Sequence, residues 1–572
     1  MTQRASWLGR LPRLRVLVFV MTSLAFGGCG DDDVPATDGG TTTDGGGMTT
    51  DGGTPGSDGG MPSDGSMGDD AGSAACDDGR ALFVPTGGEA MDVTDALRGN
   101  WTAPSAGTLR LCGGTWTANV SAPAGGGLRI ESAAGLRATL NGNVQVIGDV
   151  VVESVDVEGL FFAAGGSIAM PSGQLGLVDV HAHTIASQAM FDGAMRVEAT
   201  DSTFVADGSL LGVVAGVDFT QVEVTALKVD RGSNPLLFGG SLSLVDVTAT
   251  TTEGGFMDVT GEGTTTVRGC TLTTRGNGPA LQISNATYTV EDVDLVSDGV
   301  GGAGPLLSLM LLSSPNASTM TNLDFTMNGE RGGISGRSIA CTGCTFDDPA
   351  VAAAIEVTNG GGLTLVDCDF TGTHTQRFVS SASSGIHRVT NGSFTGGAGQ
   401  HGAAIYVPSG QLFVTDSEFT DNRATGNGGA VAAGMNINSL ASLIVSGSTF
   451  TNNTAGSMGG AIWTANPLQV SGSTFTGNTA VSGGGAILTR AQQHHILGTS
   501  TFHSNDGGVG AAVVFRFDGT HQLQVTSCDF GTGATDNTPN DVQRLLPSET
   551  LDPAVTRNAG AGASFTCDVT CR

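Results

Sequence analysis

Two short groups of residues carry the side-chain types that act on acidic sugar chains. A polysaccharide lyase needs clustered carboxylates for calcium and an Arg or Lys base, and a glycosidase needs two carboxylates at a defined separation. Histidines two residues apart are also able to bind a metal ion or transfer a proton. The residues that meet these descriptions are Asp179, His181, His183 and Asp201 in the first group and Lys228, Asp230 and Arg231 in the second.

A solvated strand face is the simpler interpretation of these groups. His181-Ala-His183 alternates polar and apolar residues, as a strand with one exposed face does, and we interpret His494-His495 in the same way. Aromatic side chains that stack on sugars are scarce, since the chain has two Tyr and four Trp, and Trp7 lies in the N-terminal leader. We therefore predict no catalytic residues and no cofactor, and we keep a polysaccharide lyase or glycoside hydrolase acting on acidic glycans as the alternative.

The elements that would position these side chains belong to a repeat, which is clearest between residues 411 and 505. A Phe-x-x-Asn motif alternates with Gly-Gly-Ala followed by Ile or Val, at a spacing of about 25 to 31 residues, and such a spacing indicates a repeat architecture. The Phe-x-x-Asn pairs are Phe419 and Asn422, Phe450 and Asn453, Phe475 and Asn478, and Phe502 and Asn505. The Gly-Gly-Ala motifs begin at Gly428, Gly459 and Gly484.

A bend must lie inside each repeat. Between Val414 and Phe419 the apolar or small residues fall at i, i+3 and i+5, which fits neither a helix nor an unbroken strand. The third position carries residue types that tolerate a left-handed backbone: Asp179, Asp201, Asp246, Gly269, Asp292, Asn322, Gly343, Asp367, Asn391, Asp416, Gly447 and Gly472. With Gly-Gly-Ala-Ile as a third strand, one repeat is one coil of a parallel β-helix.

Stacked coils place like residues in ladders. The Phe450 and Phe475 rings are expected to stack in the interior, and the Asn residues are expected to line the next turn, where they bond one another's amides and the backbone. We interpret the Asn ladder as structural rather than as a ligand site. The same repeat can be followed back to Val152 at a mean period of about 25 residues.

The sequence therefore predicts an all-β fold, a single right-handed parallel β-helix with three-strand coils similar to that of pectate lyases. We expect about 16 or more coils within residues 76–535 and a length of about 75 Å at about 4.8 Å per coil. Residues 92–98 are expected to form a short capping helix at one end, and residues 536–572 to cap the other. Long spacings predict inserted loops at residues 299–318 and 434–441.

The N-terminus has the features of a secreted, lipid-anchored protein. Residues 1–28 combine four Arg with an apolar run, as a signal peptide does, and Leu24-Ala-Phe-Gly-Gly-Cys29 resembles the lipobox of bacterial lipoproteins. The resemblance implies lipidation at Cys29 and, by analogy with lipoprotein sorting, delivery to the outer membrane. Residues 29–75 are dominated by Asp, Gly and Thr, so we expect a disordered tether.

Net charge and cysteine positions limit which ligands and which disulfides are plausible. The formal net charge is −30, which excludes nucleic acid as a plausible partner. We expect possible disulfides between Cys76 and Cys112 and between Cys344 and Cys368, which occupy consecutive coils in register. Cys567 and Cys571 are further candidates. Cys341-Thr-Gly-Cys344 lacks a second pair at zinc spacing, so we predict no metal site.

The motifs at Phe419, Phe450, Phe475 and Phe502, with Gly-Gly-Ala-Ile/Val between them, resemble the repeats of the chlamydial polymorphic outer membrane proteins. The likeness is close over residues 400–510, and the earlier coils are degenerate. The resemblance implies a β-helical surface protein, and several members of that family are adhesins. We expect a non-enzymatic outer-membrane lipoprotein that faces the cell exterior, is held by its lipid anchor and contacts glycans or other cell-surface components.

Overall fold

The structure is a computed structural model, and it describes residue 76 and most of residues 79–567. Within that range it leaves out residues 164–170, 186–187, 213, 229–240, 258–262, 285–286, 299–303, 311–317, 328–330, 348–352, 359, 374–375, 435–441, 491–493, 517–521, 547 and 549. The predicted signal peptide, Cys29, the tether and Cys571 lie outside the described residues.

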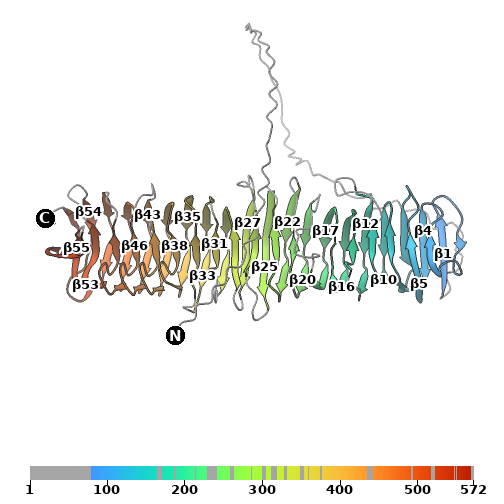
Figure 1. The fold of residues 1–572 in the computed structure, drawn as a ribbon, viewed down its shortest axis with the longest axis horizontal. Coiled ribbons are helices and arrows are strands. Elements are labelled where there is room, and N and C mark those ends of the chain that lie inside the picture. The colour runs from blue at the N-terminus through green and yellow to red at the C-terminus, as the bar shows by residue number, and fades with distance from the viewer. Residues whose placement is uncertain are drawn as a thin grey trace, which may run out of the picture. The chain divides into compact units, whose positions relative to one another are not determined.

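Parallel strands stack along one axis in successive turns, and the colours of Figure 1 follow the chain from one end of the stack to the other. Among the described residues the single helical element is the 3₁₀ turn η1 (Gly533–Thr535). The predicted all-β parallel β-helix is therefore confirmed. Three rows of strands make up the coils, and most strands hydrogen-bond to their equivalents in the coils before and after them.

The first-strand row begins each coil. Its members are β4 (Gly107–Cys112), β6 (Leu128–Ser132), β9 (Val150–Glu153), β12 (Gln174–Val178), β15 (Arg196–Thr200), β17 (Gly216–Thr220), β19 (Leu242–Val245), β22 (Thr264–Arg268), β25 (Thr287–Ser297), β27 (Thr319–Thr326), β29 (Ile339–Thr342), β32 (Leu363–Val366), β35 (Ile386–Thr390), β39 (Gln411–Thr415), β43 (Leu443–Ser446), β47 (Leu468–Ser471), β51 (His495–Gly498) and β54 (Leu523–Cys528).

The second-strand row follows the bend, and β25 and β27 run through the bend into it. Its other members are β5 (Thr115–Ser121), β7 (Ala138–Asn141), β10 (Val155–Glu158), β13 (His181–Thr184), β16 (Thr203–Ser209), β18 (Glu223–Lys228), β20 (Thr248–Thr251), β23 (Thr271–Thr274), β30 (Thr345–Asp347), β33 (Asp369–Thr371), β36 (Ser393–Thr395), β40 (Glu418–Thr420), β44 (Thr449–Thr451), β48 (Thr474–Thr476) and β52 (Thr501–His503).

The third-strand row closes each coil. Its members are β3 (Gly99–Thr102), β8 (Val144–Val146), β11 (Phe161–Ala163), β14 (Phe191–Asp192), β21 (Phe256–Met257), β24 (Leu281–Ile283), β26 (Gly304–Leu309), β28 (Arg331–Gly336), β31 (Ile355–Val357), β34 (Val379–Ser381), β38 (Ile405–Val407), β42 (Val431–Ala433), β46 (Ile462–Thr464), β50 (Ile487–Thr489), β53 (Asp506–Arg516) and β55 (Thr538–Leu545). Short strands precede it at β37 (Ala398–Gly399), β41 (Arg423–Ala424), β45 (Thr454–Ala455) and β49 (Thr479–Ala480). β5 runs from the second row into the third, where it lies between β3 and β8.

The bend between the first and second strands is left-handed, as the residue types predict. Every residue predicted at this position has a positive φ, from 48° at Asp416 to 65° at Gly343. Four further residues occupy the same position with φ between 46° and 55°, although their types do not predict a left-handed backbone: Ser154, Gln221, Thr499 and Ser527. Stacking therefore imposes the left-handed conformation even on residues that do not favour it.

A second left-handed position, which was not predicted, comes directly before each of the four predicted ladder Asn residues. Asp421, Asn452, Gly477 and Ser504 have φ between 54° and 66°. Asp421, Asn452 and Gly477 are of types that tolerate this conformation, so three of the four positions carry the signal in the sequence. The chain thus turns sharply on both sides of the second strand.

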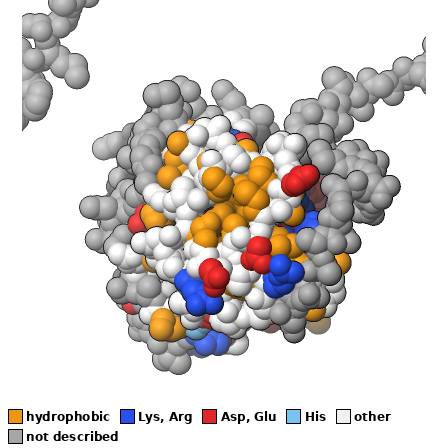
Figure 2. Space-filling view, turned by 90° about the vertical axis from the view of Figure 1, so that its right-hand side faces the viewer, with side chains coloured by type: hydrophobic (Ala, Val, Ile, Leu, Met, Phe, Trp, Pro, Cys, Tyr) orange, Lys and Arg blue, Asp and Glu red, His pale blue; other side chains and the backbone are white. Residues whose placement is uncertain are grey.

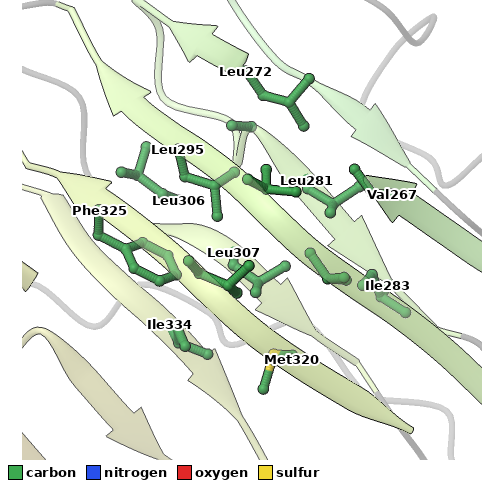
Figure 3. Close-up of a cluster of buried hydrophobic side chains, with 14 of the residues drawn as sticks. Val267, Leu272, Leu281, Ile283, Leu295, Leu306, Leu307, Met320, Phe325 and Ile334 are labelled. Atoms are coloured by element: carbon green, nitrogen blue, oxygen red, sulfur yellow. The ribbon is translucent and has the colours of Figure 1, made fainter. Parts of the chain in front are cut away.

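The interior is filled from all three rows. Figure 3 shows Leu295, Phe325 and Met320 from the long strands β25 and β27 beside Leu306, Leu307 and Ile334 from the third-strand row. Further along the axis, Phe325, Phe346, Phe370, Phe394, Phe419, Phe450, Phe475, Phe502 and Phe530 form one stack with ring centroids 4.6–5.0 Å apart. Each buried Phe contributes about 1.5–3 kcal/mol through burial.

Antiparallel strands cover the two ends of the stack. At the start, β1 (Arg80–Pro85) pairs with β4 and with β2 (Met91–Asp92). Figure 2 faces this end and shows apolar side chains gathered in its middle, with acidic and basic side chains beside one another near the rim. At the finish, β56 (Leu551–Arg557) and β57 (Ala563–Cys567) pair with β55 and β54. The predicted capping helix at residues 92–98 is wrong, because β2 and a turn occupy that segment.

The Gly-Gly motif is required by close contact between coils. Its first Gly has a positive φ, 71° at Gly459 and 68° at Gly484. Its second Gly leaves no room for a side chain, because a Cβ on Gly460 would overlap the carbonyl oxygen of Gly485 in the next coil. The motif therefore marks a place where two backbones touch.

We predict that Gly460→Ala lowers the free energy of unfolding by about 1–3 kcal/mol, because the added methyl group must push two coils apart. The matched control is Gly472→Asn. Gly472 has a φ of 58° and its added Cβ would meet nothing closer than 3.9 Å, so Asn should change stability by less than about 0.5 kcal/mol. Urea unfolding of the two variants checks this, and equal losses would contradict it.

Candidate functional site

The predicted Asn ladder lies inside the solenoid. Asn422, Asn453, Asn478 and Asn505 are fully buried. The Oδ1 atom of each one after Asn422 accepts hydrogen bonds from the backbone N–H and the Nδ2 of the preceding Asn, at 2.9–3.1 Å. Each Nδ2 also donates to a Phe carbonyl, as Asn453 does to Phe419 at 2.9 Å. The amides therefore satisfy one another and the backbone, and they do not face a ligand.

The ladder continues one step beyond its predicted end. Asn537 accepts from the backbone N–H and the Nδ2 of Asn505, both at 3.0 Å, and its own Nδ2 donates to Asp541 at 2.9 Å. Asn537 stands seven residues after Phe530 rather than three, because η1 is inserted between them. The spacing rule that found the other ladder residues therefore missed it.

Serine and cysteine share a second buried column at the start of the second strand. Ser417 N–H donates to Ser448 Oγ and Ser448 N–H donates to Ser473 Oγ, both at 3.2 Å. Cys270, Cys344, Cys368 and Cys528 occupy the equivalent position and are buried. Burial raises the pKa of Cys270 to about 11. Burial also raises the pKa of Cys368 and Cys528, so the three free thiols are protonated small side chains at neutral pH and are poor metal ligands or nucleophiles.

The predicted Cys344–Cys368 disulfide is wrong. Cys344 pairs with Cys341 across the bend at Gly343, with Cα atoms 6.1 Å apart, and Cys368 is a free thiol that donates to the Cys341 carbonyl at 3.4 Å. Both side chains that flank a sharp inward bend point into the core, so they meet within one coil.

The structure places the other predicted cysteines as follows. Cys76 and Cys112 form a disulfide with Cα atoms 5.3 Å apart, which ties the first described residue to β4. Cys567 is disulfide-bonded, and it ends β57. Its predicted partner Cys571 lies outside the described residues, as does the lipidation candidate Cys29.

The residues considered as catalytic do not converge. Asp179 lies on a bend, where Arg137 Nη1 approaches its carboxylate at 3.1 Å and Ser154 Oγ donates to it at 2.8 Å. Burial alone would raise the pKa of Asp179, but these hydrogen bonds outweigh it and hold the pKa below its ordinary value. His183 pairs with Glu158 at 3.0 Å. These contacts belong to an outer face of paired charges.

The second group lies largely outside the described residues. Residues 229–240 include Asp230 and Arg231, and the side chain of Lys228 is also not described. The structure therefore gives no position for that group, and its interpretation stays a prediction.

His495 corrects the interpretation of the His494-His495 pair. His494 is exposed, but His495 is fully buried in the first-strand row, where its Nε2 lies 3.3 Å from Thr489 Oγ1. His387 takes the equivalent place four coils earlier, with Nε2 3.3 Å from Ser381 Oγ. Each histidine stands in a column of inward leucines. The sequence pattern of alternating residues does not distinguish an inward His from an outward one.

A shallow acidic hollow of about 310 Å³ spans three coils beside the bend. Asp367, Asp369, Asp416 and Glu418 line it with Asn391, whose Nδ2 donates to Asp367 Oδ1 at 2.6 Å. The described residues contain no group of three or more His, Cys, Asp or Glu side chains placed to hold a metal ion. The same part of the chain has no helix long and apolar enough to cross a bilayer.

Three segments of the chain, residues 416–434, 447–465 and 472–490, match the Chlamydia polymorphic membrane protein repeat. Each match begins at the left-handed bend and ends one residue after the third strand. It therefore takes in the Phe stack, the Asn ladder and the Gly-Gly contact. No curated protein matches the chain. The chain carries repeats of this family, and the similarity indicates a bacterial surface or outer-membrane protein built on a β-helix.

We predict that Asn478→Ala destabilises the protein by several kcal/mol. The change removes the acceptor of the Asn453 backbone N–H and the Asn478 donor to the Phe450 carbonyl, and it leaves Asn453 Nδ2 with the Phe419 carbonyl alone. Each buried polar group left unsatisfied costs about 1–3 kcal/mol. Asn427→Ala is the control, because Asn427 is half-buried in a turn outside the ladder. Equal urea midpoints for both variants would rule out a structural ladder.

We predict that stability falls as pH drops below about 6.5, in part through His387. Burial lowers the pKa of His387 in the folded chain. Below the ordinary His pKa of about 6.5, His387 therefore binds a proton more readily in the unfolded chain than in the folded chain, and this difference destabilises the fold. His387→Leu, which matches its neighbours Leu363 and Leu412, should reduce the loss of melting temperature between pH 7 and pH 5. His181→Gln, at an exposed position, should leave that loss unchanged. A wild-type slope in His387→Leu would contradict the assignment.

Proposed function

We propose that the protein is a non-enzymatic lipoprotein of the outer membrane that presents its β-helix to the cell exterior for adhesion or envelope contact. A lipid on Cys29 would hold it, and the Asp- and Gly-rich segment up to residue 75 would act as the leash. The observation that carries the proposal is the repeat match over residues 416–490, since the matched repeat is that of a polymorphic membrane protein.

The use of the recurrent polar residues supports a structural rather than catalytic role for the repeats. The side-chain amides of the Asn ladder hydrogen-bond to one another between coils. The side chains of the Ser and Cys column donate hydrogen bonds to backbone carbonyls at the bend. Asp179 is held by Arg137 and Ser154. What varies between coils is the outward side chains, and a protein that works by contact uses those.

The leader sequence supports anchoring. Small residues precede Cys29. A flexible segment of this composition acts as a tether only when its N-terminal end is fixed, and a lipid on Cys29 would fix it to the membrane. The predicted inserted segment at residues 434–441, most of which lies outside the described part of the chain, is a further candidate for contact with another surface. The prediction of a loop over all of residues 299–318 is wrong, because β26 (Gly304–Leu309) within it is a strand of the third row with buried Leu306 and Leu307.

We predict that Cys29→Ser abolishes palmitate labelling and membrane partition of the full chain. Cys270→Ser is the matched control, because Cys270 is a buried thiol at a position where other coils carry Ser. It should label and partition as the wild type does. Retained labelling in Cys29→Ser would reject the anchor.

The functional test compares adhesion with turnover. Cells that display the full chain should bind to other cells or envelope material more than cells without it, and the purified chain should release no reducing or unsaturated sugar from acidic polysaccharides. Sugar release that is lost in Asp369→Asn or Glu418→Gln, both in the acidic hollow, would establish the enzyme alternative. Unchanged adhesion without the chain would also overturn the proposal.

A further inference from the structure

The outer face of the first-strand row loses its acidic residues in the second half of the solenoid. This concerns strands β29, β32, β35, β39, β43, β47, β51 and β54, and none of them contains an Asp or a Glu. In a chain with a net charge of −30, eight successive strands without an acid form a distinct surface.

The same row is charged in its first half. Arg129 pairs with Glu131 at 2.9 Å and also contacts Glu153 in the next coil. Arg268 pairs with Glu291 at 3.2 Å. The fold is the same in both halves, so coil geometry does not require the difference.

In the acid-free half, the outward side chains at the middle of the strands are mostly apolar or amide residues. We define the acid-free stripe by the outward side chains that follow one another in register across six strands: Arg388, Phe413, Ile444, Gln469, Ile496 and Gln524. The Arg388 guanidinium lies 5.2 Å from the Phe413 ring centroid, and Ile496 is 39% exposed. From Ile444 onward, apolar and amide side chains thus alternate along the axis.

A hydroxyl column runs beside the stripe, next to the bend. It consists of Thr390, Thr415, Ser446, Ser471 and, after Gly498, Thr526. These side chains are half-buried or exposed, so their hydroxyl groups lie at the surface. The stripe and this column together offer hydrogen-bond donors, acceptors and apolar contacts with one formal charge, on Arg388.

We propose that the acid-free stripe binds an uncharged linear polysaccharide that lies along the solenoid axis. This inference deepens the proposed adhesive function and rests on it. Gln469 and Gln524 and the hydroxyl column would bond sugar hydroxyl groups, and Phe413 and the two Ile side chains would contact the apolar faces of the sugar rings.

Charge and spacing select this partner. A polyanion would gain one cation on the stripe and would face the net negative charge of the rest of the chain. A polycation would find no carboxylate within the stripe or the hydroxyl column, and it would bind instead at the acidic hollow beside the bend. Equivalent rings in these coils lie 4.6–4.9 Å apart, which is close to the length of one hexopyranose unit in an extended β-linked chain. Successive sugars would therefore meet side chains at equivalent positions of successive coils.

The test measures binding of the full chain to uncharged β-glucans, with polygalacturonate as the acidic comparison. The wild type should be retained by the uncharged polymer and not by the acidic one. Phe413→Ala and Ile496→Glu should each weaken retention by about tenfold or more, the change expected when a central contact is removed. Both side chains point outward, so both variants should keep the wild-type melting temperature.

Ser243→Glu is the matched control, because Ser243 is an outward residue of β19 in the charged half of the same row. It should bind as the wild type does. No retention by any uncharged glycan, equal retention of all variants, or binding only to proteins or acidic polysaccharides would overturn the proposal. Cell adhesion that persists in Phe413→Ala and Ile496→Glu would reject the stripe and leave the adhesive function standing. Glycan binding by a chain that does not promote adhesion would reject the adhesive function alone.

Discussion

Parallel stacking in register is the constraint on which the rest of this structure depends. Each residue has its own equivalent about 4.8 Å above and below it, so a side chain inside the solenoid must be compatible with copies of itself. Phe meets this condition by stacking, and the rings from Phe325 to Phe530 form one continuous column. Asn meets it because its amide is both donor and acceptor, so that each ladder residue completes the one before it. A buried carboxylate would repel its own copy, and the described acids of the repeated coils are accordingly placed at bends and on outer faces, whereas the buried Asp541 and Asp552 lie in β55 and β56 at the end of the stack.

Because of the same constraint, the residues that hold the coils together differ from those that are free to recognise another surface. The residues that recur most regularly are those that hold the coils together, and their hydrogen bonds are spent inside. The repeat match covers these residues, so it reports how the solenoid is built. Recognition of another surface has to come from positions that the stacking leaves unconstrained, namely the outward side chains and the loops. The change along the first-strand row, from paired charges at Arg129 and Glu131 to the acid-free stripe, is a variation of that kind.

An adhesive role and a long, regular surface are physically compatible. A column such as Arg388 to Gln524 repeats one weak contact over several coils, so that affinity for an extended partner accumulates with length. A compact catalytic pocket needs different side chains to converge from different directions. The charged groups near Asp179 instead pair along the surface, as Arg137 does with Asp156 at 2.7 Å and with Asp179. The acidic hollow at Asp367 and Glu418 is open and shallow.

The sequence by itself determined the fold class, the repeat and the left-handed bend residues, because period and residue type are local properties that stacking amplifies. It also located the Phe stack and the ladder from Asn422 to Asn505. Only the tertiary structure decided what depends on a side chain's direction or on a broken spacing. His495 and His494 are adjacent and alike in sequence, yet one faces the core and the other solvent. Cys344 bonds Cys341 rather than Cys368 because the bend brings both side chains of one coil inward. Asn537 belongs to the ladder although an inserted turn breaks the motif spacing before it. Its hydrogen-bond partner is determined by its position in space and not by its distance in sequence from Phe530.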